Sequence, residues 1–170
     1  MNILETDRLI LCRLTLDDAA FILDLLNDSL FLRFIGDKGV RTRSDARKYI
    51  LNGPVDSYER HGFGLYLTKL KDGAVPIGIC GLLKRESLND VDVGFAFLPE
   101  FRGHGYASES ASAVLDYART ILGLNRIVAL TSPDNNGSIR VLEKLGLSYQ
   151  NMLKLSDDDQ ESKLFAVAFP

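Results

Sequence analysis

Three strand patterns follow one another between residues 63 and 97 with short connections between them. The segments are FGLYLTKL (63–70), IGICGLL (77–83) and VDVGFAF (91–97), separated by the turn KDGAVP and the polar loop KRESLND. Two parallel neighbours need a crossover of about a dozen residues or more, so connections this short favour antiparallel pairing. A purely parallel, doubly wound sheet does not fit this chain, and a mixed sheet is expected.

The rest of the chain alternates between strand and helix patterns. Further strands are predicted at 8–14, 126–131, 147–155 and 163–169, and helices at 15–28, 44–52, 106–122 and 132–146, with 55–61 as a candidate for a short additional helix. Residues 30–43 are mixed, and their pattern does not distinguish a loop from a short helix. There is no repeat or break in composition. We therefore expect one α/β domain over residues 1–170, with about seven strands flanked by about four helices.

The composition excludes several classes of protein. A net charge of −3 disfavours a broad nucleic-acid-binding surface and is compatible with a cationic acceptor. No apolar run reaches the ~20 residues of a membrane span, and early charges interrupt any signal-peptide core. Cys12 and Cys80 lie in apolar runs and are expected to be buried, reduced thiols. We expect a cytoplasmic monomer or homodimer that has no nucleic-acid or membrane partner, and no His or Cys spacing indicates a metal site.

The stretch FRGHGYASES (101–110) lies between a predicted strand and a predicted helix. It holds two glycines, one arginine and small residues, but no obvious nucleophile. A helix N-terminus leaves about four amides without internal partners and carries about half a positive charge, so it favours an anion such as phosphate. Gly103 and Gly105 would let the backbone approach phosphate oxygens, and Arg102 could add a charged contact. An ordinary strand-to-helix turn explains the same residues, because glycine pairs are common in turns.

Longer stretches of the sequence narrow this interpretation. RGHGYA (102–107) matches the R/Q-x-x-G-x-G/A pyrophosphate motif of the GCN5-related N-acetyltransferases (GNAT), and the order of strands and helices resembles that fold. The stretches LETDRLILCRLTLDDA, VGFAFLPEFRGHGYASES and PDNNGSIRVLEKLGL are similar to the ribosomal-protein (RimJ/RimL-like) branch of that family, and they span most of the chain. The resemblance implies a GNAT fold whose sheet opens between its fourth and fifth strands, here 91–97 and 126–131.

The resemblance also implies acetyl-CoA as the acetyl donor. In that family the pantetheine arm lies in the V-shaped opening between the two splayed strands, and the loop amides hold the pyrophosphate. The implied cofactor-binding residues are Phe97, Leu98, Arg102, Gly103, His104, Gly105, Tyr106, Ala107, Asn135 and Ser138. Asn135 matches the family asparagine that follows the fifth strand. It is also a suitable helix N-cap, and the two roles are compatible.

Direct attack of an amine on the thioester, the reaction that the resemblance implies, needs a base, an oxyanion donor and an acid. A backbone N–H near Phe97 is the implied oxyanion donor. Many relatives carry a tyrosine seven residues after the asparagine, but Leu142 stands there. Ser138, three residues after the asparagine, therefore becomes the candidate acid for the thiolate. An ordinary first-turn helix serine is the alternative, and Tyr149 and Tyr106 are weaker substitutes.

Asp92 is the favoured base, because it occupies the acidic position two residues before Gly94, where relatives usually have glutamate. Strand alternation places it on a face with small side chains, and Asp90 on the same face could raise its pKa. Glu109 is the second candidate, although an acid also suits the first turn of a helix, and water is the third. Three other titratable residues fit exposed or structural positions better: Glu86, His61 and His104.

The predicted function is N-acetyl transfer, with the N-terminal α-amino group of a protein as the preferred acceptor. An α-amine has a pKa of about 7.7–8.0, against about 10.4 for lysine, and each unit corresponds to about 1.4 kcal/mol of deprotonation. A site that offers only a carboxylate and water therefore favours an N-terminus. The alternatives are a small amine (a polyamine, aminoglycoside or amino-acid derivative) and a non-catalytic acyl-CoA-binding module. Selection of the acceptor is expected from residues 30–62 and the loop at 84–90.

Overall fold

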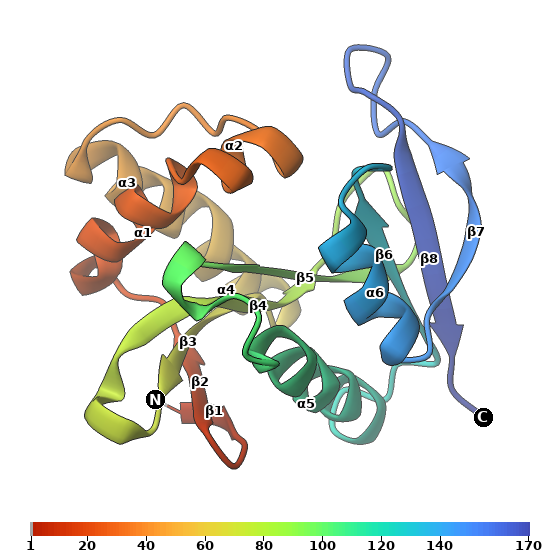
Figure 1. Cartoon of the computed structure of the whole chain (residues 1–170), viewed down its shortest axis with the longest axis horizontal. Coiled ribbons are helices and arrows are strands. Elements are labelled where there is room, and N and C mark those ends of the chain that lie inside the picture. The colour runs from red at the N-terminus through yellow and green to blue at the C-terminus, as the bar shows by residue number, and fades with distance from the viewer. Residues whose placement is uncertain (1) are drawn as a thin grey trace.

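The computed structural model describes residues 2–170, and an eight-stranded sheet runs through its centre (Figure 1). The strands are β1 (Asn2–Glu5), β2 (Leu9–Arg13), β3 (Leu65–Leu70), β4 (Pro76–Leu83), β5 (Val91–Phe97), β6 (Arg126–Thr131), β7 (Ser148–Leu153) and β8 (Ser162–Ala168). Their order in the sheet is β1-β2-β3-β4-β5-β6-β8-β7. Every neighbouring pair is antiparallel except β5 and β6. The mixed sheet predicted from the short connections is confirmed.

Six α-helices of the described chain accompany the sheet. They are α1 (Ala19–Leu26), α2 (Ser29–Phe34), α3 (Arg43–Ile50), α4 (Asp56–His61), α5 (Tyr106–Thr120) and α6 (Asn136–Lys144). Local sequence sets their ends. Thr42 begins α3 with a capping box, in which its hydroxyl accepts from the Asp45 amide at 3.0 Å and Asp45 accepts from the Thr42 amide at 3.2 Å. None of the helices in residues 2–170 has both the length and the apolar character needed to cross a membrane.

Three features differ from the sequence expectations. β1 adds an edge strand beside β2, which the short segment NILE did not reveal. α2 occupies part of the undecided segment 30–43. The helix expected from a Ser44 cap begins instead after Thr42, and a π-helical turn at Leu51–Val55 carries the chain past Pro54 into α4. Proline lacks an amide hydrogen and disrupts regular α-helix geometry, which explains why the regular helix is interrupted at this point.

Two hydrophobic clusters bury the two faces of the sheet. In one, Val114 of α5 and Leu142 of α6 pack against strand residues. In the other, Ile22 of α1 and Ile50 of α3 pack against the strands, among them Leu67. Figure 1 shows α1 to α3 above β5 and α5 below it. Cys12 and Cys80 are buried in these clusters and free, as expected.

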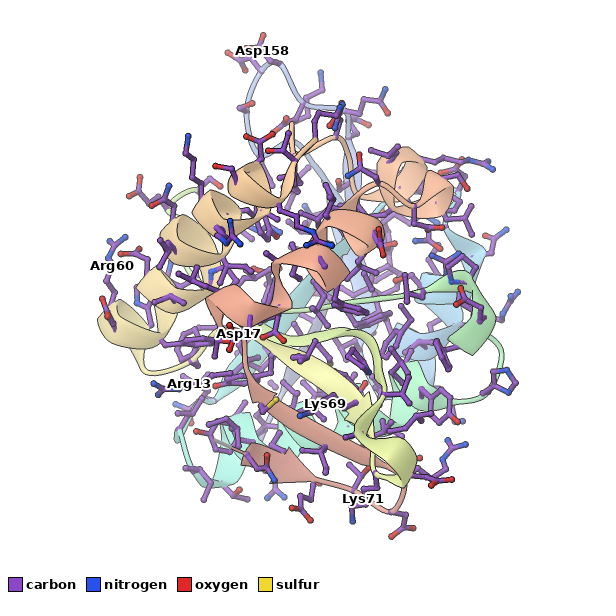
Figure 2. The ribbon with its side chains drawn as sticks, turned by 90° about the vertical axis from the view of Figure 1, so that its left-hand side faces the viewer. Arg13, Asp17, Arg60, Lys69, Lys71 and Asp158 are labelled. Carbon is purple, nitrogen blue, oxygen red and sulfur yellow. The ribbon has the colours of Figure 1, made fainter. Side chains whose placement is uncertain are left out.

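The acidic β7–β8 loop and the β3–β4 turn lie at opposite ends of the molecule. Figure 2 marks the first with Asp158 and the second with Lys71. The two hydrophobic clusters fill the region between these ends. Side chains at the β3–β4 turn are thus far from those around the β7–β8 loop, which makes the turn a suitable place for control substitutions.

The parallel pair β5–β6 opens shortly after it begins. Register pairs join Val91 to Ile127 and Asp92 to Val128, and pairing ends there, although both strands continue. β5 stays paired with β4 as far as Phe97. The sheet therefore opens between the fifth and sixth strands of the structure. These are the two segments, 91–97 and 126–131, at which the opening was predicted.

Candidate active site

The opening leaves one edge of β5 without a strand partner. The Leu98 amide donates to the Ile77 carbonyl at 2.9 Å, which continues the antiparallel ladder with β4. Because peptide groups along a strand alternate between its two edges, those of Phe95 and Phe97 point away from β4 into the opening. An extended ligand with amide groups fits such an edge, because it can bond there as a strand does.

Leu98 lies differently from its predicted role. Its amide bonds to Ile77, and its carbonyl accepts from the Phe101 amide at 3.0 Å, so both of its backbone groups have partners within the chain. The ladder with β4 continues one residue beyond Phe97, which is why Leu98 faces β4. Phe97, and Phe95 which the sequence analysis did not select, present the unpaired edge instead.

The loop after β5 presents a row of amides without partners. Gly103 and Gly105 both have left-handed backbone conformations (φ 78 and φ 84), and Gly105 precedes α5 without a side-chain cap. The first helical bond runs from the Glu109 amide to the Gly105 carbonyl at 3.0 Å. Within residues 2–170, the amides from Gly103 to Ser108 have no acceptor. Such a concave run of amides at a helix N-terminus is typical of phosphate sites.

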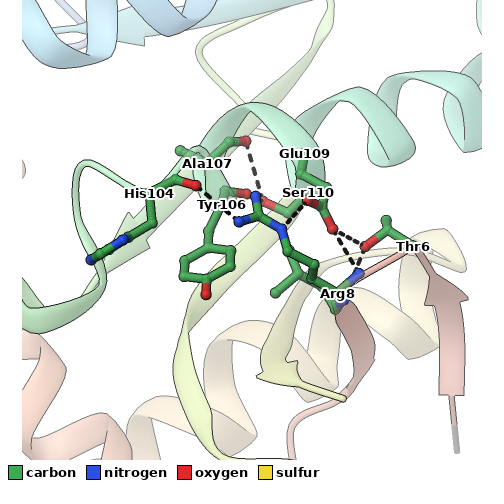
Figure 3. Close-up of polar contacts among 8 residues, drawn as sticks. Thr6, Arg8, His104, Tyr106, Ala107, Glu109 and Ser110 are labelled. Carbon is green, nitrogen blue, oxygen red and sulfur yellow. Dashed lines mark hydrogen bonds and ion pairs between the residues drawn. The ribbon is translucent and has the colours of Figure 1, made fainter. Parts of the chain in front are cut away.

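Arg8 fastens this loop to the first strands (Figure 3). Its Nε donates to the Glu109 carboxylate at 2.7 Å, and its Nη1 donates to the His104 carbonyl at 3.1 Å. Its guanidinium also lies 4.4 Å from the centroid of the Tyr106 ring. The Thr6 hydroxyl and the Arg8 amide donate to the same Glu109 carboxylate. These contacts fix the shape of the loop from a segment about a hundred residues away in sequence.

Glu109 is engaged in this network on both carboxylate oxygens. Partial burial acts to raise the pKa of Glu109, but the hydrogen bonds from Thr6 and Arg8 outweigh it and hold the pKa below its ordinary value. A carboxylate with a low pKa and occupied oxygens is a poor proton acceptor. This geometry favours the structural alternative for Glu109.

Arg102 connects the same loop to α2. Its Nη2 lies 2.5 Å from Oδ2 of Asp28, and Asp28 also accepts from the Phe31 amide at 3.2 Å to cap α2. Partial burial acts to raise the pKa of Asp28, but Arg102 and the backbone amides outweigh it and lower the pKa. The motif arginine thereby links the loop to the helix on the opposite side of the opening.

Asn135 and Ser138 lie at the start of α6, next to the end of β6. Asn135 caps the helix, with its side-chain oxygen accepting from the Ser138 amide at 3.2 Å. The cap that the sequence suggested for Asn135 is therefore present. The Ser138 hydroxyl has no hydrogen-bond partner within residues 2–170. Leu142, which stands at the family tyrosine position, is buried in the core.

Asp92 is a buried carboxyl in the wall of the opening. It is 2% exposed, and burial raises its pKa to about 6, although Arg85 Nε at 3.3 Å from Oδ1 partly opposes the shift. Asp90, which was expected to contribute, pairs instead with Arg126 at 3.2 Å. The raised pKa thus comes from desolvation. A carboxyl of this kind is ionised at neutral pH and still basic enough to accept a proton.

A cavity of about 760 Å³ joins these groups. The predicted site residues that line it are Asp92, Phe97, Arg102, Gly103, Gly105, Tyr106, Ala107, Asn135 and Ser138. Leu98, His104 and Glu109 do not belong to its lining. His104 is exposed, and it contributes to the Arg8 network through its carbonyl. The structure thus brings Asp92, Ser138 and the loop amides to one continuous space.

The other side of the cavity is formed by residues that the sequence analysis located only as ranges. They are Leu30, Phe31, Phe34 and Ile35 around α2, with Lys38, Tyr49 and Arg85. Burial raises the pKa of Tyr49. Arg85 stood in an ordinary polar loop and had no pattern that would mark it. For Thr6 and Arg8 a signal existed, since they belong to the quoted stretch LETDRLILCRLTLDDA.

Comparison with known proteins gives the same picture. The acetyltransferase (GNAT) domain family matches residues 8–148. The uncharacterized N-acetyltransferase YoaA of Bacillus subtilis is 31% identical over 154 residues, covering 89% of this chain and 86% of its own. YnaD of the same organism, also an uncharacterized N-acetyltransferase, is 28% identical over 151 residues, covering 89% and 85%.

Solved structures share the fold at lower identity. RimL, a ribosomal L7/L12 α-N-protein acetyltransferase solved with coenzyme A, has a TM-score of 0.85 at 18% identity, covering 99% of this chain and 98% of its own. An acetyltransferase of Agrobacterium tumefaciens has a TM-score of 0.84 at 22% identity, covering 99% and 95%. MccE, a microcin C7 self-immunity acetyltransferase solved with acetyl-CoA and AMP, has a TM-score of 0.79 at 15% identity, covering 96% and 94%.

The opened sheet, the loop of unpaired amides and the family match agree. Acetyl-CoA is the donor, and the acceptor is an amine. YnaD and YoaA, which share most of the chain, are named as N-acetyltransferases, and this supports an enzyme rather than a non-catalytic acyl-CoA-binding module. The chain belongs to the GNAT acetyltransferase family and is an acyltransferase.

Proposed function

We propose that this enzyme acetylates the N-terminal α-amino group of a protein, with Asp92 as the proton acceptor. The observation that carries the proposal is the buried Asp92 carboxyl in the cavity wall, whose pKa is raised to about 6. The gap between this pKa and that of an α-amine is about 2 units, against about 4 for a lysine side chain. Proton transfer to Asp92 is therefore much less unfavourable from an α-ammonium group than from the ammonium group of a lysine side chain.

The residues present fit acetyl-CoA along the whole opening. The amides from Gly103 to Ser108 and the Arg102 guanidinium would hold the pyrophosphate, and the peptide groups of Phe95 and Phe97 would bond the pantetheine amides. The bound donor supplies an acetyl group activated as a thioester. Asn135 would bond the arm of the donor through its side-chain amide hydrogens, because its side-chain oxygen already caps α6.

Three groups of the chain serve the reaction itself. Asp92 accepts the ammonium proton, directly or through one water, so that the neutral amine can attack. The Phe97 N–H points into the opening and donates to the acetyl oxygen as it becomes anionic. The Ser138 hydroxyl, which lines the cavity and has no partner in the described chain, would donate a hydrogen bond to the sulfur as the C–S bond breaks. The sulfur would then take up the second proton of the attacking amine and leave as a thiol.

Two structural relatives differ in the molecule that their names mention beside the donor. RimL is named for α-N acetylation of a ribosomal protein, whereas MccE was solved with AMP beside acetyl-CoA. A small amine is thus the second candidate for this chain. The two candidates are distinguished by the substrates that are turned over. An enzyme for protein N-termini acetylates the terminus of a peptide whatever residues lie far downstream.

A pH–rate profile on a peptide with a free N-terminus tests the proposal. We expect kcat to rise with an apparent pKa of about 6 in the wild type and to fall about 100-fold or more in Asp92→Asn, within the usual range for general-base removal. Ser138→Ala should lower kcat about tenfold, while the apparent pKa of the rising limb of the kcat–pH profile stays unchanged. The acetyl-CoA dissociation constant, measured by calorimetry, should stay near normal in both.

A peptide with a blocked N-terminus and an internal lysine is the matched acceptor control, and it should be acetylated poorly. Equal rates on the two peptides would remove the α-amine from the proposal. An unchanged kcat in Asp92→Asn would remove Asp92 from the mechanism.

A further inference from the structure

The cavity wall carries an unbalanced positive charge. Its basic lining residues are Lys38, Arg85, Arg102, Arg140 and Lys144, whereas Asp92 is the acidic residue of its lining. Asp28, behind the wall, pairs with Arg102, so the excess lies with the other four cations. The whole chain has a net charge of −3, so this excess is local to the cavity. A cavity lined by one sign of charge concentrates ligands of the opposite sign.

The basic residues fall into two groups. Arg102 in the loop, with Arg140 and Lys144 on α6, lies on the donor side near the partner-free amides. Lys38 and Arg85 lie on the acceptor side, with α2 and the buried Asp92. The phosphates of the donor account for the first group and leave the second without an explanation.

Lys38 and Arg85 are only weakly neutralised by the protein. Arg85 uses its Nε for Asp92 at 3.3 Å, and its terminal nitrogens have no partner within residues 2–170. Lys38 forms no ion pair in the same part of the chain. Partial desolvation and the nearby Arg85 charge lower the pKa of Lys38, while Asp159 acts in the opposite direction. Two cations held together at a cavity wall are a favourable place for an anion.

We propose that the acceptor is an amine with an anionic group close to it, and that Lys38 and Arg85 bind this group. The inference rests on the proposed function and specifies the acceptor of the same site. Arg85 contacts Asp92, so an acceptor whose anion bonds the terminal nitrogens of Arg85 brings its ammonium group towards the proposed base. For a protein acceptor, the anionic group is the side chain of an Asp or Glu at the second position.

The acceptor charge is tested with peptides that differ at one position. Peptides Ser-Asp-, Ser-Asn- and Ser-Lys- with a common neutral remainder present the same N-terminus with different neighbours. We expect kcat/KM for the Asp peptide to exceed that for its nearly isosteric Asn peptide about tenfold, as one charge-assisted contact implies, with most of the change in KM. The preference should shrink as salt is raised.

Aspartate α-amide and asparagine α-amide, which are the same small amine with and without the side-chain charge, form a second arm of the experiment. A preference for the anionic compound among these, with no activity on peptides, would assign the same anion site to a small acceptor and exclude a protein N-terminus. A preference for the Asp peptide, with no activity on the small amines, supports a protein N-terminus as the acceptor.

Charge reversal at Lys38 tests the binding group. Lys38→Glu should remove the preference for Asp over Asn and make the Lys peptide the better substrate, while the acetyl-CoA dissociation constant stays unchanged. Lys71→Glu is the control for charge reversal, because Lys71 does not line the cavity and lies at the β3–β4 turn (Figure 2). This variant loses the exposed ion pair with Glu5 at 3.6 Å and should keep the wild-type preference.

The two proposals fail in different ways. Efficient acetylation of all three peptides without preference, or an unchanged preference in Lys38→Glu, would overturn the anion site and leave N-terminal acetylation standing. Absence of acetylation on every amine, with acetyl-CoA binding intact, would contradict the proposed function itself.

Discussion

At the scale of single residues, Asp92 and Glu109 show how surroundings divide the roles of two carboxyl groups. Asp92 is desolvated and has one long contact to Arg85, so its pKa is raised. Glu109 accepts from Thr6 and Arg8, so its pKa is lowered. The first is suited to accept a proton, and the second to hold a loop. Their effects on stability should therefore have opposite signs.

Asp92→Asn should stabilise the protein at alkaline pH. The folded pKa of about 6 lies above the ordinary 3.8, so the stability associated with protonated Asp92 is fully present below about pH 4 and is lost as pH rises through 6. Removing the charge should raise the free energy of unfolding by up to about 3 kcal/mol at pH 8 and by almost nothing at pH 4.

Urea unfolding at pH 4, 6 and 8 measures this difference. Asp90→Asn is the control, because Asp90 is partly exposed and pairs with Arg126, and it should show no such gain. An Asp92→Asn variant that is less stable than the wild type at pH 8 would contradict the desolvated state of this carboxyl.

Glu109→Gln should affect the loop and leave the proton transfer unchanged. The neutral amide keeps the volume but loses the charged contacts to Arg8, so we expect a loss of about 1–2 kcal/mol of stability and severalfold weaker acetyl-CoA binding. The limb of the kcat–pH profile near pH 6 should remain. Thermal unfolding, calorimetric titration and the pH profile measure the three effects. Loss of that limb would return Glu109 to the role of base.

At the scale of elements, the loop from β5 to α5 combines two requirements in a few residues. It must turn the chain with left-handed residues, and it must leave its amides unbonded. Gly103 and Gly105 meet the first requirement, and the absence of a side-chain cap on α5 meets the second. A local pattern therefore contains most of the information about this part of the site.

Gly105→Asp should weaken acetyl-CoA binding about 100-fold or more, because it adds a strained side chain and a negative charge at the N-terminus of α5. Gly123→Asp is the matched control. It has a similar left-handed φ of 68 and open space around its Cβ position, but it lies beyond the other end of α5. Calorimetric titration with acetyl-CoA compares the two variants. If both variants lost acetyl-CoA affinity equally, backbone strain and not a phosphate site at Gly105 would explain the loss.

At the scale of the whole molecule, the sequence predicted those features that short segments encode. The mixed sheet followed from the connections at 71–76 and 84–90, and the loop at 102–107 from its glycines. The brace from Arg8 to Glu109 was not predicted, because it joins residues 101 positions apart. The acceptor wall also depends on distant packing, since it brings Lys38 together with Arg85.

The opened sheet has a consequence for the lifetime of the folded protein. Register pairs at the β5–β6 boundary are confined to the first two residues. In the binding mode proposed above, a donor lying along β5 would add the hydrogen bonds that a neighbouring strand would have supplied. A ligand that binds only the folded chain stabilises it by about 2.7 kcal/mol at a concentration 100 times its dissociation constant. We therefore expect saturating acetyl-CoA to lengthen the lifetime of the purified protein in a proteolysis assay, because the bound donor lowers the population of the unfolded chain.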